Sequence, residues 1–127
     1  MKFLTLAVSL VFTLAFAMAF SSAPALAADP AVTDPDKYKV VLENDRVRVF
    51  DYRDHPGDRT KEHTHKDFVL YVVEPFKRKL TFPNGESKTR DFKAGEVIFM
   101  KAQTHIGENV GTHDTHAFIV ELKELSH

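Results

Sequence analysis

Two histidines separated by one residue are the part of this sequence with the clearest chemistry. His63 and His65 flank Thr64, and they belong to a set of seven histidines in 127 residues. Alternate side chains of a β-strand point to the same face, so a strand here would project both imidazoles together. Neighbouring imidazoles suit a first-row transition metal. Such pairs also occur on protein surfaces without a metal, so both interpretations stay open at this point.

Composition restricts the other chemistries. The chain has no cysteine, which excludes disulfides, thiolate metal sites and a cysteine nucleophile. The 17 Lys and Arg residues against 18 Asp and Glu give a net charge of −1, so there is no basic excess with which to bind a nucleic acid. Hydrophobic residues make up 43% and charged residues 28%, a balance typical of one globular domain.

The N-terminal residues have the pattern of a secretory signal peptide over residues 1–27. Lys2 supplies a positive charge, residues 3–20 are mostly apolar, and Ala25-Leu26-Ala27 forms a small-residue cleavage site. An uncleaved membrane anchor is the alternative, because the apolar run is long for a signal. We expect cleavage after Ala27 and a periplasmic or secreted protein with no membrane attachment afterwards. Residues 28–37, with two prolines and three aspartates, are predicted to be a flexible lead-in to a single domain over residues 38–127.

The domain itself is predicted to be all-β. Short runs rich in Val, Phe, Tyr and Ile are separated by turn residues, and no helical pattern is convincing. The expected strands are Tyr38–Leu42, Arg46–Tyr52, Glu62–His65, Phe68–Val73, Phe76–Phe82, Lys88–Phe92, Val97–Lys101, His105–Asn109 and Thr115–Lys123. So many short strands in one domain close into a barrel or stack as a sandwich.

Three details of the strand pattern make specific predictions. Asn84-Gly85 predicts a hairpin with a type I′ turn, because both residues tolerate a positive φ. Phe68–Val73 is apolar throughout and is expected to be a central strand buried on both faces. Between Phe76 and Phe82 apolar and polar residues alternate, except that Arg78 breaks the pattern.

Two spaced motifs resemble those of the cupin family. The matching residues are Gly57, His63 and His65 in the first motif, and Gly95, His105 and Asn109 in the second. The second motif has one residue fewer than usual before its histidine, and Lys101 and Gln103 stand where proline and glycine are common. The resemblance covers Tyr38 to Lys123 and implies a small double-stranded β-helix, a jelly-roll barrel.

A closer likeness is to small single-domain bacterial cupins. The segments that carry it are Lys93-Ala94-Gly95, Thr104-His105 with Glu108-Asn109, and the closing Val120-Glu121-Leu122-Lys123. One departure concerns the ligands, because the glutamate usual in cupins falls near residues 68–70, which are all apolar here.

The resemblance therefore implies a metal site of three histidines, His63, His65 and His105. It is similar to the three-histidine iron sites of the thiol and diketone dioxygenases among the cupins. The cofactor it implies is one divalent transition metal, with Fe, Ni, Zn, Cu and Co all compatible with imidazole ligands. Three ligands would leave positions open for a substrate, water or O₂.

Several further residues are candidates for the pocket around that metal. The candidates for lining it are Phe68, Leu70, Tyr71, Phe99 and Phe118. Glu108 could enter the site as a fourth ligand or a base, or it could be a solvated loop charge. His55, His113 and His116 are expected at the rim or surface, and His127 at a mobile terminus. Arg46 and Arg48 share one strand face, which is either solvated or placed to bind a substrate carboxylate.

These features leave more than one function open. The first is an exported metalloenzyme that performs a dioxygenase-type or other metal-assisted reaction on a small anionic substrate. The second is a non-catalytic periplasmic module that binds a metal or a small anion, and the third is a structural barrel whose histidines meet only water. The cupin resemblance also implies a homodimer paired through edge strands, which would cover exposed strand edges.

Overall fold

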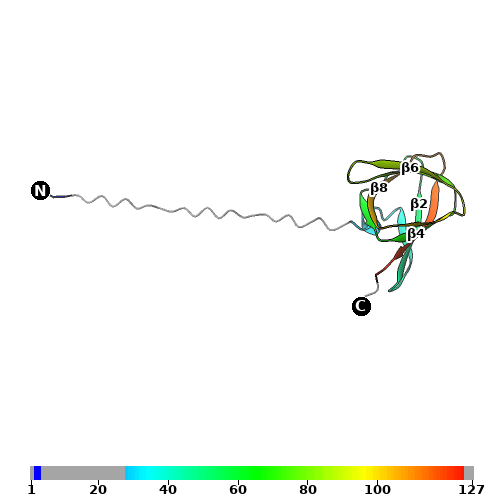
Figure 1. The fold of residues 1–127 in the computed structure, drawn as a ribbon, viewed down its shortest axis with the longest axis horizontal. Coiled ribbons are helices and arrows are strands. Elements are labelled where there is room, and N and C mark those ends of the chain that lie inside the picture. The colour runs from blue at the N-terminus through cyan, green and yellow to red at the C-terminus, as the bar shows by residue number, and fades with distance from the viewer. Residues whose placement is uncertain (1, 4–27, 125–127) are drawn as a thin grey trace.

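The computed structural model describes residues 2–3 and 28–124 (Figure 1). Apart from Lys2 and Phe3, the predicted signal segment and its cleavage site lie outside the described residues, as does His127. Within the described part of the chain, no helix has both the length and the apolar character needed to cross a membrane.

All nine predicted strands are present, each within two residues of its predicted ends. They are β1 (Tyr38–Glu43), β2 (Val47–Asp54), β3 (His63–His65), β4 (Phe68–Val72), β5 (Phe76–Thr81), β6 (Ser87–Phe92), β7 (Val97–Met100), β8 (Gln103–Asn109) and β9 (Thr115–Leu122). One short helix, α1 (Pro30–Thr33), precedes them.

The strands form two antiparallel sheets that enclose the core. One sheet has the order β1-β2-β9-β4-β7 and the other the order β3-β8-β5-β6. Alternate residues of each strand point inward, which is why the burial of β9 alternates strictly from Thr115 to Glu121. The core between the sheets includes Phe50, Val72 and Ile119. The strand pattern predicts this all-β architecture, and the cupin resemblance implies its double-stranded β-helix form.

Residues 28–37 are packed against the domain, where the sequence predicts a flexible lead-in. Asp29 caps α1 by accepting a hydrogen bond from the Ala31 amide, and Pro30 at the start of the helix is buried. The Asp34 carboxylate accepts a hydrogen bond from the Lys61 amide. Prolines and aspartates are typical of loops, but they are also the residues that begin helices, and that second role applies here.

The β5–β6 hairpin forms at Asn84-Gly85, but its turn is not of type I′. Gly85 has a φ of +85°, whereas no residue other than glycine has a positive φ in the described chain. Asn84 therefore lacks the positive φ that a type I′ turn requires. The ring of Pro83 fixes the φ of Pro83 itself near −65°. This value favours a type I turn over Pro83 and Asn84, followed by Gly85 in the left-handed region.

The prediction that the β4 strand is buried on both faces is wrong for its outer face. Phe68, Leu70 and Val72 point inward and are buried, but Tyr71 is 43% exposed. Its neighbours on the outer face of β7, Val97 and Phe99, are also exposed. An outer face that is apolar gives the same continuous hydrophobic sequence as a strand with both faces covered.

Arg78, which interrupts the apolar alternation of β5, points into the domain. Its guanidinium donates to Asp54 Oδ2 at 2.9 Å and to the Tyr52 hydroxyl at 3.0 Å. Asp54 also accepts hydrogen bonds from Tyr52 and from the side-chain amide of Asn109. The buried charge is thus matched by a buried carboxylate, which is the condition for retaining an arginine in a core.

Gly107 on β8 makes room for that guanidinium. A β-carbon at this position would lie 2.2 Å from Nη2 of Arg78. We predict that Gly107→Ala lowers the free energy of unfolding by about 1–3 kcal/mol, because the methyl group displaces Arg78 from Asp54. Chemical denaturation measures the loss. In an Arg78→Met background the same alanine should cost clearly less, and an equal cost in both backgrounds would contradict this explanation.

Candidate metal centre

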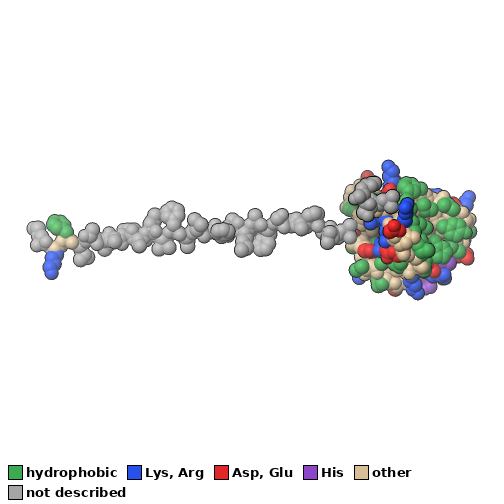
Figure 2. Space-filling model, turned by 90° about the horizontal axis from the view of Figure 1, so that it is seen from below, with side chains coloured by type: hydrophobic (Ala, Val, Ile, Leu, Met, Phe, Trp, Pro, Cys, Tyr) green, Lys and Arg blue, Asp and Glu red, His purple; other side chains and the backbone are tan. Residues whose placement is uncertain are grey.

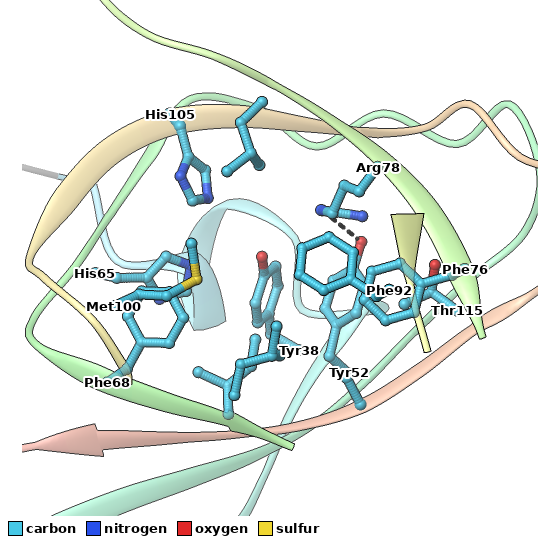
Figure 3. A pocket seen from close by; sticks show the side chains of 14 residues that line it. Tyr38, Tyr52, His65, Phe68, Phe76, Arg78, Phe92, Met100, His105 and Thr115 are labelled. Carbon is cyan, nitrogen blue, oxygen red and sulfur yellow. Dashed lines mark hydrogen bonds between the residues drawn. The ribbon is translucent and has the colours of Figure 1, made fainter. Parts of the chain in front are cut away.

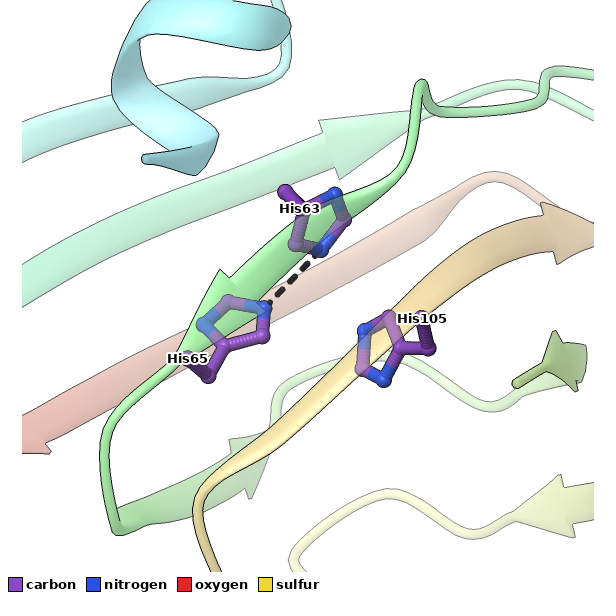
Figure 4. A group of neighbouring side chains, drawn as sticks. All are labelled: His63, His65 and His105. Atoms are coloured by element: carbon purple, nitrogen blue, oxygen red, sulfur yellow. Dashed lines mark hydrogen bonds between the residues drawn. The ribbon is translucent and has the colours of Figure 1, made fainter. Parts of the chain in front are cut away.

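The pairing of β3 with β8 brings the three histidines together inside the barrel. His63 and His65 point inward from β3, and His105, which lies opposite His63 in the register, points inward from β8 (Figure 4). The exposed fractions are 0% for His63, 1% for His65 and 4% for His105. The two-residue repeat of a strand predicts that the two β3 imidazoles share one face, and in the structure that face is the inner one.

The ring nitrogens of the three histidines converge on one region. One nitrogen of each ring lies within 4.8 Å of the nitrogens offered by the other two. The His63 and His65 Nε2 atoms are 3.1 Å apart. Two ligands of one ion with metal–nitrogen bonds of about 2.0–2.1 Å have a comparable separation.

Each imidazole has a hydrogen-bond acceptor on its other nitrogen. Nδ1 of His63 lies 2.9 Å from the backbone oxygen of Lys61, and Nδ1 of His65 lies 3.3 Å from Glu121 Oε2. Nδ1 of His105 lies 2.9 Å from Oε1 of Gln103, whose amide nitrogen donates to the Lys101 carbonyl and so fixes the orientation of the amide. These acceptors place the proton of each neutral ring on Nδ1 and leave an Nε2 lone pair facing inward.

A cation is the group that this arrangement of lone pairs fits. The Tyr38 hydroxyl lies 3.2 Å from His63 Nε2 and can donate its single proton there. That proton cannot also satisfy His65 Nε2, which faces His63 Nε2 across 3.1 Å. A divalent metal ion would satisfy several of these lone pairs at once, so the donor set fits a metal.

Burial keeps two of the three imidazoles in the neutral form that binds metals. Burial lowers the pKa of His63 to about 4, with a further contribution from the nearby His65. Burial likewise lowers the pKa of His105 to about 2, helped by the two neighbouring histidines and Arg78. Both rings are therefore neutral at neutral pH, which is the form that offers a lone pair.

Glu121 on β9 holds His65 from behind and is itself held by an arginine. Nη2 of Arg48 lies 2.7 Å from Oε1 of Glu121, and Nη1 of Arg48 lies 2.6 Å from Oδ2 of Asp29. Burial by itself would raise the pKa of Glu121, but hydrogen bonds from His65 and Arg48 outweigh burial and leave that pKa lowered. The result is a carboxylate–histidine pair of the kind that orients metal ligands.

A small cavity lies beside the histidines. Its volume is about 50 Å³, and its walls include His65, His105 and Phe68 on one side and Arg78 on the other (Figure 3). Most of the other lining side chains are apolar, and Leu70 is among them. A cavity of this size has room for a few water molecules or a small group of a larger ligand.

Strand alternation separates the predicted pocket residues into two groups. Phe68 and Leu70 line the cavity as expected. The other four candidates occupy outward positions and do not line the cavity. They are Tyr71 on β4, Phe99 on β7, Phe118 on β9 and Glu108 on β8. Glu108 points outward because it lies three residues after the inward-pointing His105 on β8, and residues an odd number apart on a strand point to opposite faces. These four side chains therefore face away from the cavity.

Three further histidines, His55, His113 and His116, do not join the cluster. His55 is exposed and lies 3.0 Å from Asp114. His113 is exposed, and His116 on β9 is half-buried near Asp51. Arg48, one of the two arginines considered for binding a substrate carboxylate, points inward from β2. Its guanidinium instead binds the carboxylates of Glu121 and Asp29.

Sequence reasoning did not identify the residues that support the ligands. Glu121 on β9 contacts His65 on β3, a strand far from it in the chain. Gln103 contacts His105, which lies two residues further along the same strand. Both residues stand inside the segments compared with the cupin family, and Glu121 continues the inward positions of β9. That combination of motif and alternation is the signal that would have found Glu121.

Solved structures with the same architecture confirm the fold. A cupin domain protein from Bordetella pertussis Tohama I is 26% identical to this chain, covers 68% of it and 92% of its own length, and gives a TM-score of 0.63. A protein with a double-stranded β-helix domain from Klebsiella pneumoniae is 24% identical over 68% of this chain and 83% of its own, with a TM-score of 0.52. An RmlC-like cupin family protein from Methanocaldococcus jannaschii is 14% identical over 68% and 78%, with a TM-score of 0.54.

Comparison with protein-family models gives no match, and neither does comparison with curated protein sequences. The structural likeness nevertheless defines the class. The chain has the cupin fold, the RmlC-like double-stranded β-helix, with a buried cluster of three histidines inside it.

The role of Glu121 gives a prediction about metal affinity. Glu121→Gln keeps the size of the side chain but removes the charge that orients and polarises His65, so we expect affinity for Zn²⁺ to fall about 10–100-fold. Competition with a chelator of known affinity measures the change. Glu108→Gln is the matched control on the outer face and should leave the affinity unchanged. A larger loss in the control would show that the wrong carboxylate has been assigned.

Proposed function

We propose that this protein is a metal-dependent cupin that holds one divalent transition-metal ion through His63, His65 and His105. The observation that carries the proposal is the convergence of three buried imidazoles whose Nδ1 atoms already have acceptors. Iron, nickel, zinc, copper and cobalt all accept imidazole ligands. A bound ion of this kind would supply Lewis-acid chemistry, or redox chemistry with O₂ if it is redox-active.

We propose further that the cavity beside the histidines admits the reacting part of a small substrate. Its apolar walls exclude bulk water, which strengthens every electrostatic interaction inside it. Tyr38 would donate a hydrogen bond toward His63 Nε2 or toward a bound group. Burial raises the pKa of Tyr38, so this hydroxyl serves as a hydrogen-bond donor and not as a base at neutral pH.

Metal content tests the proposal directly. Elemental analysis of untagged protein should find close to one equivalent of a single transition metal per chain. His63→Ala and His105→Ala should each lower the content severalfold or more, because each removes one of only three ligands. His55→Ala, an exposed histidine outside the cluster, is the matched control and should retain the metal.

Two results would contradict the metal site. One is a protein that contains no transition metal and takes none up after chelation at neutral pH. The other is equal metal loss in His55→Ala and His63→Ala. When the metal has been identified, O₂ consumption with iron, or hydrolysis and isomerisation with zinc or nickel, tests for catalysis.

A non-catalytic metal-binding module is the second candidate function. The observation that favours it is the lack of a proton donor or acceptor that titrates near neutral pH among the cavity-lining residues other than the histidines. Tyr38, Tyr52 and Arg78 all have raised pKa values and keep their protons. Stoichiometric metal without turnover of any small organic anion would favour this second function.

We propose that the protein acts outside the cytoplasm. The support for this is the pattern of residues 1–27, with its charged start, apolar run and small-residue cleavage site. In a periplasmic or secreted location, the chain could acquire its metal only from that compartment or before export.

We also propose a homodimer, formed through the outer face of the five-stranded sheet. A row of apolar residues crosses all five strands on this face, in the order Phe99, Val69, Val120, Val49 and Leu42. A second row joins Val97, Tyr71 and Phe118 and continues through Asp51, whose charge is matched by Arg53, to the exposed Lys39. A symmetric dimer places one such face against another, and a largely apolar face suits that arrangement.

Charge substitutions on this face test the dimer. The double variant Val97→Lys/Phe99→Lys should be monomeric, because pairing would then bury like charges against each other. Light scattering coupled to size-exclusion chromatography measures the mass. Val32→Lys, at an exposed position on α1 away from the face, should stay dimeric. A wild-type protein that is monomeric at the highest soluble concentration would contradict the proposal.

A further inference from the structure

The β5–β6 hairpin carries like charges opposite each other on its inner face. Arg78 on β5 lies directly opposite Arg90 on β6, and Leu80 lies opposite Lys88. On the outer face of β5 the charges are instead complementary, since Lys77 lies opposite Asp91. Like charges directly opposite each other destabilise a sheet, so the basic inner face has a cost that the outer face avoids.

These basic residues line an open groove next to the cavity. The groove has a volume of about 690 Å³, and its charged lining residues are all basic, namely Arg78, Lys88, Arg90 and Lys101. The two hollows share Arg78, Leu80, Phe92 and Met100 as a common wall. The groove is therefore the solvent side of the wall that closes the cavity.

Two of the four basic groups have no partner in the described part of the chain. Arg78 is paired with Asp54, and Arg90 with Glu96 at 3.1 Å. Lys88 and Lys101 form no ion pair among the described residues. The protein as a whole is slightly acidic, with a net charge of −1, so this local excess of positive charge is a property of the groove.

Apolar side chains lie between the charges. Leu80, Phe82, Phe92 and Met100 contribute hydrophobic surface to the same groove. Figure 2 shows that, on the face it presents, acidic, basic and apolar side chains are intermixed. The groove differs from that mixed surface in that its charged lining has a single sign.

The groove also reaches the histidine cluster. Gln103 lines the groove, and its Oε1 accepts the hydrogen bond from His105 Nδ1 at 2.9 Å. The Phe82 ring, in the same lining, lies 6.5 Å from the His105 ring between centroids. A molecule in the groove could thus contact Gln103, which in turn contacts the candidate metal ligand His105.

We propose that this groove binds the carboxylate of an organic acid with an apolar body. Lys88, Lys101 and Arg90 contact the carboxylate, and Phe82, Phe92 and Met100 contact the body. The other end of the molecule points past the common wall toward His65 and His105. This last part rests on the proposed metal-dependent function, whereas carboxylate binding in the groove does not.

Binding of benzoate to the full chain tests the proposal, with benzyl alcohol as a neutral probe of similar shape and inorganic phosphate as a probe of charge alone. Lys88→Gln/Arg90→Gln removes two positive charges from the groove. Lys77→Gln/Lys79→Gln removes two from the outer face of β5 and is the matched control. Calorimetric or NMR titration of metal-free and metal-loaded protein gives each dissociation constant, and thermal unfolding verifies that each variant is folded.

We expect benzoate to bind the wild type and the control variant with similar affinity, and the groove variant about tenfold more weakly or worse. Benzyl alcohol and phosphate should bind wild type about tenfold more weakly than benzoate. Equal benzoate affinity in the groove and control variants, or equal affinity for benzoate and either other probe, would overturn the proposal. Because metal-free protein is titrated too, a failed metal site and a failed carboxylate groove give different results.

Discussion

Three imidazoles buried against one another form the constraint on which the rest of the structure depends. Neutral imidazole has one donor and one acceptor, and a buried polar group without a partner is costly. The donors are satisfied by the Lys61 carbonyl, Glu121 and Gln103, which belong to three different parts of the fold. The acceptors can then face only one another, Tyr38 or a cation. The outward nitrogens of the cluster all have hydrogen-bond partners, whereas its inward nitrogens have lone pairs that could accept a metal ion.

The same constraint gives the N-terminal segment a structural role. Glu121 needs a cation to stay ionised while buried, Arg48 supplies it, and Asp29 shares the charge of Arg48. Next to Asp29, the Ala28 carbonyl accepts a hydrogen bond from the Thr64 amide, between the two histidines of β3. Cleavage after Ala27 would leave all these contacts in the mature chain. Residues 28–37 thus belong to the support of the candidate metal centre as much as to the start of the domain.

Local sequence patterns predict the strands well, because the alternation of side chains along a strand involves only consecutive residues. The His63–His65 pair belongs to this class, and the cupin resemblance adds His105 from a distant strand. Glu121 is different, because its contact with His65 depends on how β9 and β3 are placed in the closed barrel. Tyr71 and Phe99 belong to an apolar outer face, and their sequence pattern does not distinguish them from cavity-lining residues, since a hydrophobic residue does not indicate which face of a sheet it occupies. Arg78 interrupted the apolar pattern at a position that the structure turns inward.

The distribution of charge inside the barrel favours an anion that spans it. At one end His63 and His105 are uncharged at neutral pH, so neither ring would add positive charge to a divalent ion held there, and Glu121 would compensate that ion only from behind His65. At the other end Arg78 is neutralised by Asp54, but the groove beyond it retains Lys88 and Lys101. With such an ion bound, an anionic group would be stabilised at either end, and the apolar wall between the ends would exclude water from its middle. Because Tyr38 and Arg78 hold their protons, chemistry in this cavity would have to draw its proton transfers from the substrate or from water. That requirement favours substrates that are already ionised when they bind, such as carboxylates, over neutral ones that need a base.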